Sequence, residues 1–309
     1  MRVIFMGTPD FAVPCLERLI SDGEEVVGVF TQPDKPKGRG HVMTPPPVKE
    51  LALKHDIPVF QPTKMKDGQA FEIIDKLDPE LIIVVAYGRI LPKDILERPK
   101  YGCVNIHASL LPKYRGAAPI QWAVINGEKV SGVTSMQMSE GLDTGDMLIK
   151  REVEITEEMT AGELHDILSP LGADVMSDTI KEIKAGALKP EKQNDADSTY
   201  ASMLDKSLSP IDWSKEASVI HNQIRGLSPW PTATTTLDGK VLKIHSSRVS
   251  DIKGKNPGEI IFNDKKLVVS CGNNTSLEIT VLQAEGKKAM SADRFLLGKK
   301  IELSTVLGK

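Results

Sequence analysis

Short apolar runs alternate with amphipathic segments along the first half of the chain. The apolar run over residues 2–7 is followed by a segment, residues 10–20, whose apolar side chains recur at helical spacing. Residues 80–88 and 102–108 are nearly continuous apolar runs, which is typical of strands that are buried on both faces of a parallel sheet. The pattern therefore predicts an α/β fold with an N-terminal Rossmann-like, mostly parallel sheet and helices on both of its faces.

The same patterns place the other elements of this region. They predict a strand over residues 24–32 and helices over residues 47–55 and 69–77. Residues 130–155 contain two β-rich runs around a glycine-rich loop, GLDTGD, at 141–146. A long helix is predicted over residues 160–186, broken or bent near Pro170.

The last third of the chain has a different pattern. Residues 186–210 are polar with little periodicity, which indicates a linker between domains. Beyond it we predict a helix over 214–227, a hairpin with Asp238-Gly239 at its turn, and a second hairpin over 259–271. Several short strands in about 100 residues favour a small OB-like β-barrel. We expect a catalytic domain at 1–188, a linker at 189–208 and a C-terminal domain at 209–309.

Composition narrows the class of protein. The 309 residues suit about two domains, no apolar run approaches the length of a membrane helix, and the opening residues do not resemble a secretory signal. Three widely spaced cysteines, Cys15, Cys103 and Cys271, form neither a disulfide framework nor a zinc motif. We therefore expect a cytoplasmic protein.

The charges are unevenly distributed. Residues 1–205 carry 23 Lys and Arg against 32 Asp and Glu, a net charge of −9, whereas residues 206–309 carry 16 against 10, a net charge of +6. This asymmetry suits a nucleic-acid-binding C-terminal part, and equally an ordinary lysine-rich surface.

The strand predicted at 102–108 ends in side chains suited to catalysis. Asn105 and His107 point to the same face, at the sheet edge where ligands bind in such folds. The amide can donate to a developing oxyanion, and a protonated imidazole can stabilise or protonate it. Asp143, between two glycines of the GLDTGD loop, is a candidate third member. The alternative is a buried Asn and His that satisfy backbone groups, with Asp143 capping a turn.

Several other chemistries lack their motif. The first turn, MGTPDFA, does not have the glycine spacing of a dinucleotide site, and the chain contains no P-loop, nucleophile elbow or metal-binding motif. Cys103 shares a strand face with Asn105 and His107, but a buried structural cysteine is the simpler interpretation.

A long basic loop follows the second predicted strand. Residues 31–49 are rich in Pro and Gly and group Lys35, Lys37 and Arg39 around Asp34. Such a loop beside a catalytic edge can grip a phosphate backbone, although a solvated loop would have the same composition.

These motifs together resemble one family. VNIHASLLPKYRGAAPIQ, residues 104–121, is similar to the signature of the folate-dependent formyltransferases, with its N-x-H-x-S-L-L-P core, and GLDTGD resembles their downstream aspartate loop. VIFMGTPDFAVP (3–14), VVAYGRILP (84–92) and IRGLSPWPTA (224–233) resemble members of this family that act on a charged tRNA. The resemblance keeps the same order over essentially the whole chain.

The resemblance implies an enzyme that transfers the formyl group of 10-formyltetrahydrofolate to the α-amine of methionyl initiator tRNA, for translation initiation. It makes Asn105, His107 and Asp143 catalytic and needs no metal. It assigns the folate pocket to Ser109, Leu110, Leu111, Pro112, Tyr87, Gly88, Arg89 and Ile90. It assigns tRNA contacts to Lys35, Lys37 and Arg39 and to the C-terminal domain, in a chain expected to be monomeric.

Two other functions remain open. A related formyltransferase acting on a small amine would share the catalytic trio and the folate pocket, but it would need neither the basic loop nor the C-terminal domain. A non-catalytic RNA-binding protein on the same fold would not need an intact set of Asn105, His107 and Asp143.

Overall fold

The computed structural model describes residues 1–37 and 42–309, with Lys37 described by its backbone only. The chain forms two compact units: residues 1–119, 131–153 and 165–201 in the first, and residues 120–130, 154–164 and 202–309 in the second.

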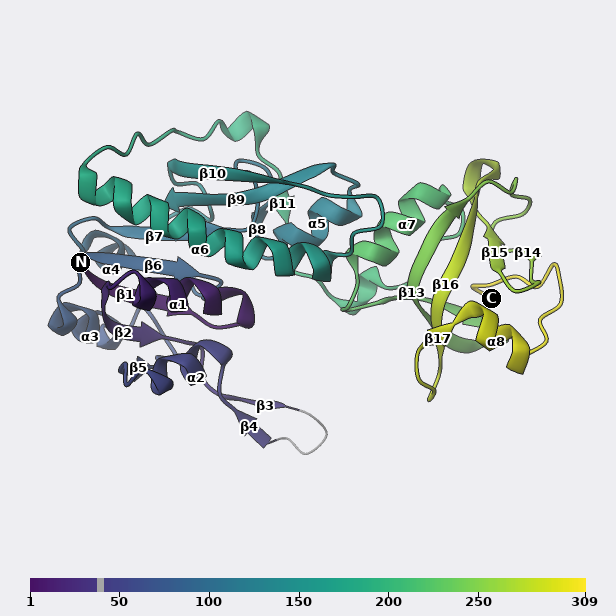
Figure 1. Ribbon diagram of the computed structural model, residues 1–309, viewed down its shortest axis with the longest axis horizontal. Helices are drawn as coiled ribbons and strands as arrows, with labels where there is room; N and C mark the ends of the chain where they lie inside the picture. The colour runs from purple at the N-terminus through teal and green to yellow at the C-terminus, as the bar shows by residue number, and fades with distance from the viewer. Residues whose placement is uncertain (38–41) are drawn as a thin grey trace. The chain divides into compact units, whose positions relative to one another are not determined.

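The described part of the first unit is built on a seven-stranded sheet of order β10-β9-β7-β6-β1-β2-β5 (Figure 1). Its strands are β1 (Arg2–Gly7), β2 (Glu25–Phe30), β5 (Val59–Phe60), β6 (Leu81–Val85), β7 (Cys103–His107), β9 (Val130–Gln137) and β10 (Met147–Glu154). The five strands β5, β2, β1, β6 and β7 run parallel, and β9 pairs antiparallel with β7. The predicted mostly parallel sheet is confirmed.

Helices cover both faces of this sheet, as predicted (Figure 1). They are α1 (Val13–Ser21), which follows the 3₁₀ turn η1 (Asp10–Ala12), α2 (Pro47–Lys54), α3 (Gln69–Leu77), α4 (Lys93–Glu97) and α6 (Ala161–Ala185). Ile4 and Met6 of β1 share a buried cluster with Ile74 of α3 and Ile95 of α4. On the other face Gly172 of α6 lies against Ile106 of β7, where a Cβ on the glycine would be 3.3 Å from that side chain. Alternate strand residues thus serve opposite layers.

Short elements complete the first unit. They are β3 (Lys35–Lys37) and β4 (Val42–Thr44), which form an antiparallel pair, and β8 (Arg115–Gly116), β11 (Tyr200–Ala201) and η2 (Asp195–Asp197). The loop expected at residues 31–49 therefore contains a small two-stranded ribbon. Strand β11 pairs in parallel with β8, although more than 80 residues separate them along the chain.

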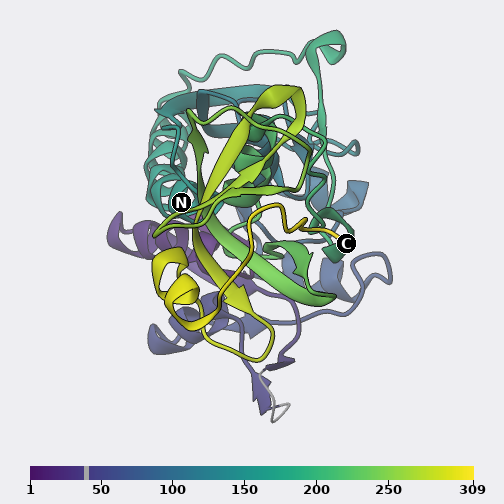
Figure 2. The same ribbon diagram turned by 90° about the vertical axis from the view of Figure 1, so that its right-hand side faces the viewer.

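The second unit contains a curled antiparallel sheet, which faces the viewer in Figure 2. Its elements are α5 (Pro119–Ile125, which begins in the first unit), η3 (Lys206–Leu208), α7 (Ala217–Gly226), β12 (Ala233–Leu237), β13 (Lys240–Ser250), β14 (Ile260–Phe262), β15 (Leu267–Ser270), η4 (Gly272–Asn274), β16 (Ser276–Ala284), β17 (Met290–Ser291) and α8 (Ala292–Gly298). Both predicted hairpins are present, and the first turns at Asp238 (φ +52°) and Gly239 (φ +71°), as two-residue hairpins require.

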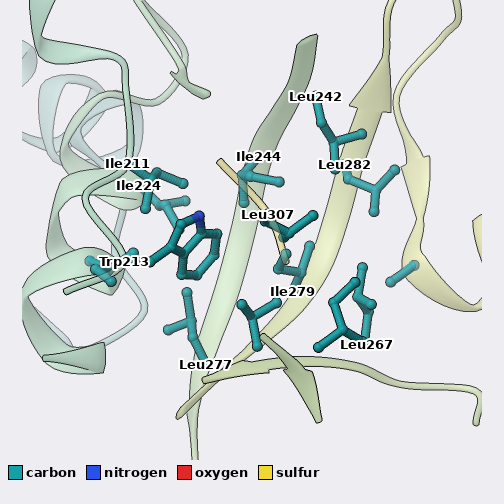
Figure 3. Close-up of a cluster of buried hydrophobic side chains, with 14 of the residues drawn as sticks. Ile211, Trp213, Ile224, Leu242, Ile244, Leu267, Leu277, Ile279, Leu282 and Leu307 are labelled. Carbon is teal, nitrogen blue, oxygen red and sulfur yellow. The ribbon is translucent and has the colours of Figure 1, made fainter. Parts of the chain in front are cut away.

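The second unit has its own hydrophobic core (Figure 3). Trp213 lies among Ile244, Leu277 and Ile279 of the sheet and Leu307 near the end of the chain. The indole Nε1 donates to Thr235 Oγ1 at 3.0 Å, so the one polar atom of this buried ring is satisfied. The last third of the chain therefore buries a hydrophobic cluster that extends from Ile211 to Leu307.

Candidate active site

The structure brings Asn105, His107 and Asp143 together at the end of strand β7. The Nδ2 atom of Asn105 lies 3.5 Å from Asp143 Oδ1, and the Nδ1 atom of His107 lies 3.7 Å from Asp143 Oδ2. Strand alternation puts Asn105 and His107 on one face, and the turn between β9 and β10 carries Asp143 to them. Both contacts are longer than an ordinary hydrogen bond, so both donors keep capacity for another acceptor.

The His107 ring is held by its other nitrogen. Nε2 lies 2.9 Å from the carbonyl oxygen of Tyr114. A carbonyl oxygen can only accept, so Nε2 carries a hydrogen and Nδ1 is the atom presented to Asp143. The side chains of His107 and Asp143 are only 7% and 11% exposed, so their interaction is weakly screened by water.

The carboxylate of Asp143 is oriented from its own backbone and from strand β8. Asp143 adopts a left-handed conformation (φ +52°), which Asp tolerates better than most residues. The backbone N–H of Gly116 donates to Asp143 Oδ2 at 2.8 Å. Gly145 is required at its position, because a Cβ there would lie 1.6 Å from the carbonyl oxygen of Gln137. The loop thus presses against the end of β9.

The expected folate residues 109–112 form a turn that side-chain hydrogen bonds hold in place. Ser109 Oγ donates to the Lys113 carbonyl at 2.7 Å, and Thr134 Oγ1 donates to the Ser109 carbonyl at 2.7 Å. Leu111 is buried in a cluster with Met136 and Met147, whereas Leu110 and Pro112 are half-buried. The turn directly follows β7, beside the three polar residues.

The expected folate residues 87–90 follow the neighbouring strand β6. Tyr87 is buried, its hydroxyl donates to the sulfur of Met65, and burial raises the pKa of that hydroxyl to about 12. Gly88 has φ +74°, and Ile90 is 67% exposed. The Nε atom of Arg89 is buried and has no hydrogen-bond partner within residues 1–37 and 42–309. An unpaired buried donor of this kind suits a polar ligand.

The structure describes the three residues expected to contact tRNA to different extents. Lys35 lies exposed on β3, Lys37 ends the same strand, and Arg39 lies outside the described residues. Asp34 at the base of this ribbon accepts from Lys49 Nζ at 2.8 Å and from Gln61 Nε2 at 2.9 Å. These contacts hold the pKa of the Asp34 carboxyl below its usual range, so the base of the ribbon is an ion pair at neutral pH.

The residues that the structure describes offer neither a reactive cysteine beside the site, nor a metal site, nor a membrane-spanning helix. Cys103 is fully buried, with its sulfur near the carbonyls of Ile95 and Leu96, and burial raises its pKa to about 12. No group of three or more His, Cys, Asp and Glu side chains within 1–37 and 42–309 is arranged to hold a metal ion. In the same described segments, no helix combines the length and apolarity needed to cross a membrane.

Residues 193–201 contribute contacts that sequence reasoning missed. Gln193 Nε2 donates to the carbonyls of Asp143 (2.8 Å) and Gly145 (2.7 Å), and the Thr199 hydroxyl accepts from the backbone N–H of Tyr114 at 2.8 Å. This stretch lacks apolar periodicity, so no pattern in a single sequence could have indicated these contacts.

Comparison with protein families accounts for both units. Residues 1–180 match the family model described as formyl transferase, and residues 203–300 match the model of the formyl transferase C-terminal domain. The chain belongs to the formyl transferase family. This agrees with the resemblance that the motifs carry and with the gathering of the polar trio at the edge of the sheet.

Curated formyl transferases match this chain along its whole length. Methionyl-tRNA formyltransferase of Alkaliphilus oremlandii is 54% identical over 310 residues, covering 100% of both chains. The protein of the same name from Geobacter metallireducens is 52% identical, covering 100% of this chain and 99% of its own.

Solved structures of other proteins share the fold. The N-formyltransferase of Helicobacter canadensis, in complex with folinic acid and dTDP-3-aminofucose, matches with a TM-score of 0.71 at 22% identity, covering 91% of this chain and 98% of that one. HypX of Aquifex aeolicus, in complex with tetrahydrofolic acid, matches with a TM-score of 0.62 at 16% identity, covering 99% of this chain and 50% of that one.

Proposed function

We propose that this formyl transferase moves the formyl group of 10-formyltetrahydrofolate to the α-amino group of methionyl initiator tRNA. The product is the N-formylmethionyl-tRNA used in translation initiation. The observation that carries the choice of acceptor is the similarity, at 50–54% identity along the full chain, to relatives that are all named methionyl-tRNA formyltransferase. We expect the enzyme to act as a cytoplasmic monomer.

The reaction is a direct transfer between two bound substrates. The neutral amine of the methionyl group attacks the formyl carbon, and a new C–N bond forms as the carbonyl oxygen becomes an oxyanion. The bond from that carbon to N10 of the folate then breaks, and the proton lost by the amine goes to N10. The main contribution of the protein to such a reaction is to hold both substrates in contact and to stabilise the oxyanion.

The trio divides this work. Asn105 Nδ2 and His107 Nδ1 are the two donors for the oxyanion, because neither makes a short bond to Asp143. Asp143 faces Nδ1 of His107 and takes part in removing the proton of the amine. Metal-free, non-covalent chemistry of this kind needs no nucleophilic side chain, and the buried Cys103 is left out of it.

We place the folate between the turn after β7 and the turn after β6. Leu110, Leu111 and Pro112 offer apolar contacts, and the unpaired Nε of Arg89 offers a donor to a polar edge of the ligand. Ser109 serves this pocket through its backbone and by fixing the turn, since its hydroxyl is already bound to the Lys113 carbonyl. Tyr87 and Gly88 shape the opposite turn, and the exposed Ile90 can pack on a ring.

We assign the tRNA to the basic ribbon and to residues 209–309. Lys35 and Lys37 lie on β3, in the loop that follows β2 at the carboxyl edge of the sheet, and Arg39 comes two residues later in the sequence. Residues 206–309 carry a net charge of +6. Lys and Arg contacts to phosphates release counterions, so binding through these groups weakens as salt rises.

A transfer assay with competing acceptors tests this function. The purified protein is given 10-formyltetrahydrofolate with methionyl initiator tRNA, free methionine or an amino-sugar nucleotide, and the formylated product is measured for each. We expect rapid transfer to methionyl-tRNA and little to the small amines. Faster transfer to the amino sugar would replace the proposed acceptor, and no transfer to any amine would remove the enzymatic function.

A further inference from the structure

We infer that Gln193 is a positioning residue that fixes Asp143 toward His107, an inference that rests on the proposed function of this site. Its carboxamide bonds in three directions. Nε2 donates to the Asp143 carbonyl at 2.8 Å and to the Gly145 carbonyl at 2.7 Å, and Oε1 accepts from Arg115 Nε at 2.9 Å. Both hydrogens and one lone pair of the group are thus used.

These bonds close a ring of contacts around the catalytic carboxylate. Gln193 holds the backbone of Asp143 and, through Oε1, the side chain of Arg115. The next residue, Gly116, donates its backbone N–H to Asp143 Oδ2 at 2.8 Å. Gln193 therefore fixes the backbone of Asp143, and Gly116, the neighbour of Arg115, fixes its carboxylate. Together these contacts set the direction of the carboxylate.

The residue just before strand β8 fixes the imidazole. Tyr114, which precedes Arg115, provides the carbonyl that accepts from His107 Nε2. Gln193 therefore binds both segments that orient His107 and Asp143 toward each other, namely the Asp143 turn and strand β8. A side chain that touches neither substrate can in this way control the 3.7 Å separation between His107 Nδ1 and Asp143 Oδ2.

The segment that carries Gln193 is itself held in place by backbone hydrogen bonds on both sides. Glu191 exchanges two backbone hydrogen bonds of 2.8 Å with Met147 of β10. Further along, the Thr199 and Ala201 carbonyls accept from the backbone N–H groups of Arg115 and Ala117 at 2.9 and 2.8 Å. The side chain of Gln193 is half-buried, while the neighbours on both sides, 191–192 and 194–197, are exposed. Within this otherwise solvated stretch, Gln193 is the residue that turns inward to the site.

The geometry also explains why an amide is needed at this position. A glutamate would keep the acceptor for Arg115 but would face the two carbonyls with an oxygen instead of a donor. An alanine would remove all three bonds. Both variants remove the hydrogen bonds that Gln193 donates to the Asp143 turn. Asp143 has a left-handed conformation, which costs more free energy than an extended one, so the turn depends on such contacts to keep its shape.

The test compares Gln193→Ala and Gln193→Glu with a matched control, Asn194→Ala. Asn194 is the next residue and also carries a carboxamide, whose Nδ2 donates to Asp197 Oδ2 at 2.9 Å and whose Oδ1 accepts from the backbone N–H of Ala196 at 3.2 Å. For both Gln193 variants we expect kcat to fall about tenfold to hundredfold at saturating substrates, since small misplacements of catalytic groups carry such losses. The KM for 10-formyltetrahydrofolate should stay within about threefold, because the substitutions remove no contact between the protein and the folate.

A second readout needs no acceptor and separates positioning from a structural role. In protein labelled with ¹⁵N-histidine, the ring signals of His107 should move in both Gln193 variants and stay in place in Asn194→Ala, while the unfolding midpoints of the three variants remain similar. Unmoved His107 signals, or a kcat loss no larger than that of Asn194→Ala, would overturn the inference. If wild-type protein does not formylate methionyl-tRNA, the proposed function fails, whereas the His107 signals still decide the role of Gln193.

Discussion

The imidazole of His107 is bound on both sides, with Nε2 at 2.9 Å from the Tyr114 carbonyl and Nδ1 facing the Asp143 carboxylate at 3.7 Å. The short contact anchors the ring, and the long one leaves room for a substrate oxygen. The two nitrogens of one side chain therefore have separate tasks, anchoring and chemistry. Catalytic hydrogen bonds are often long before substrates bind and tighten in the complex.

The two tasks of His107 can be separated by substitution. In His107→Gln the amide nitrogen can take the place of Nε2 and keep the bond to Tyr114, while no group replaces Nδ1. We expect kcat to fall at least about hundredfold in His107→Gln and in Asp143→Asn, the size of effect seen when an acid–base or oxyanion group is lost. His107→Ala should in addition lose about 1–3 kcal/mol of unfolding free energy, because the buried hydrogen bond from Nε2 to the Tyr114 carbonyl is removed.

The measurements are single-turnover rates, folate binding and denaturant unfolding. The control is His55→Ala, since His55 is exposed at the end of α2, and it should behave as wild type. Near-normal turnover in His107→Gln or in Asp143→Asn would show that the ring edge facing Asp143 does no chemistry.

Much of the first unit could be predicted because its signals are local. Apolar runs and helical spacing depend on neighbouring residues only. They located the parallel strands β1, β2, β6 and β7, though not the two-residue strand β5, and placed Asn105 and His107 on one face. The course of helix α6 around Pro170 was less certain from sequence. The proline predicts a break or a bend, and the helix is not broken, because it runs over Ala161–Ala185 with Pro170 inside it. The proline is exposed, so the carbonyl that it leaves unpaired can meet water.

The support of the site could not be predicted, because it comes from pairing between distant segments. Nothing local in 191–201 indicates that Thr199 holds Tyr114 or that Gln193 holds the Asp143 turn. Backbone and carboxamide hydrogen bonds leave no periodic trace in a sequence. The glycine-flanked loop made Asp143 a candidate partner and the family resemblance favoured it, but no spacing in the chain indicates its proximity to His107, since the turn between β9 and β10 must fold back to create it.

Gly145 should be intolerant of a methyl group for purely steric reasons. Its φ is not in the left-handed region, but a Cβ would lie 1.6 Å from the Gln137 carbonyl oxygen, so the Asp143 turn would have to move. We expect Gly145→Ala to lower kcat about tenfold or more, with folate binding retained. Gly298→Ala is the matched control, because a Cβ there meets no atom within 4 Å. Equal rates for the two variants would mean that the turn can shift without moving the carboxylate.

The basic ribbon should act on one substrate only. Lys35→Ala and Arg39→Ala are expected to lower kcat/KM for methionyl-tRNA, Arg39 by about tenfold or more, and each lost phosphate contact should reduce the salt slope of binding by about one. The KM for 10-formyltetrahydrofolate should not change. Lys54→Ala, at an exposed position at the end of α2, is the control of equal charge. An unchanged rate at subsaturating tRNA would remove the ribbon from the tRNA interface.

The three thiols should be unreactive in the folded protein. Burial raises the pKa of Cys15, Cys103 and Cys271 to about 12, because an apolar surrounding disfavours the charged thiolate, which is the reactive form. At pH 8 the thiolate fraction is therefore very small, and access is blocked as well, since all three side chains are buried. We expect no reaction with a thiol-specific disulfide reagent over minutes, full transfer activity after treatment with iodoacetamide, and three titratable thiols once the chain is unfolded. Rapid modification of one native thiol with loss of transfer would instead bring Cys103, on the face shared with Asn105 and His107, into the mechanism.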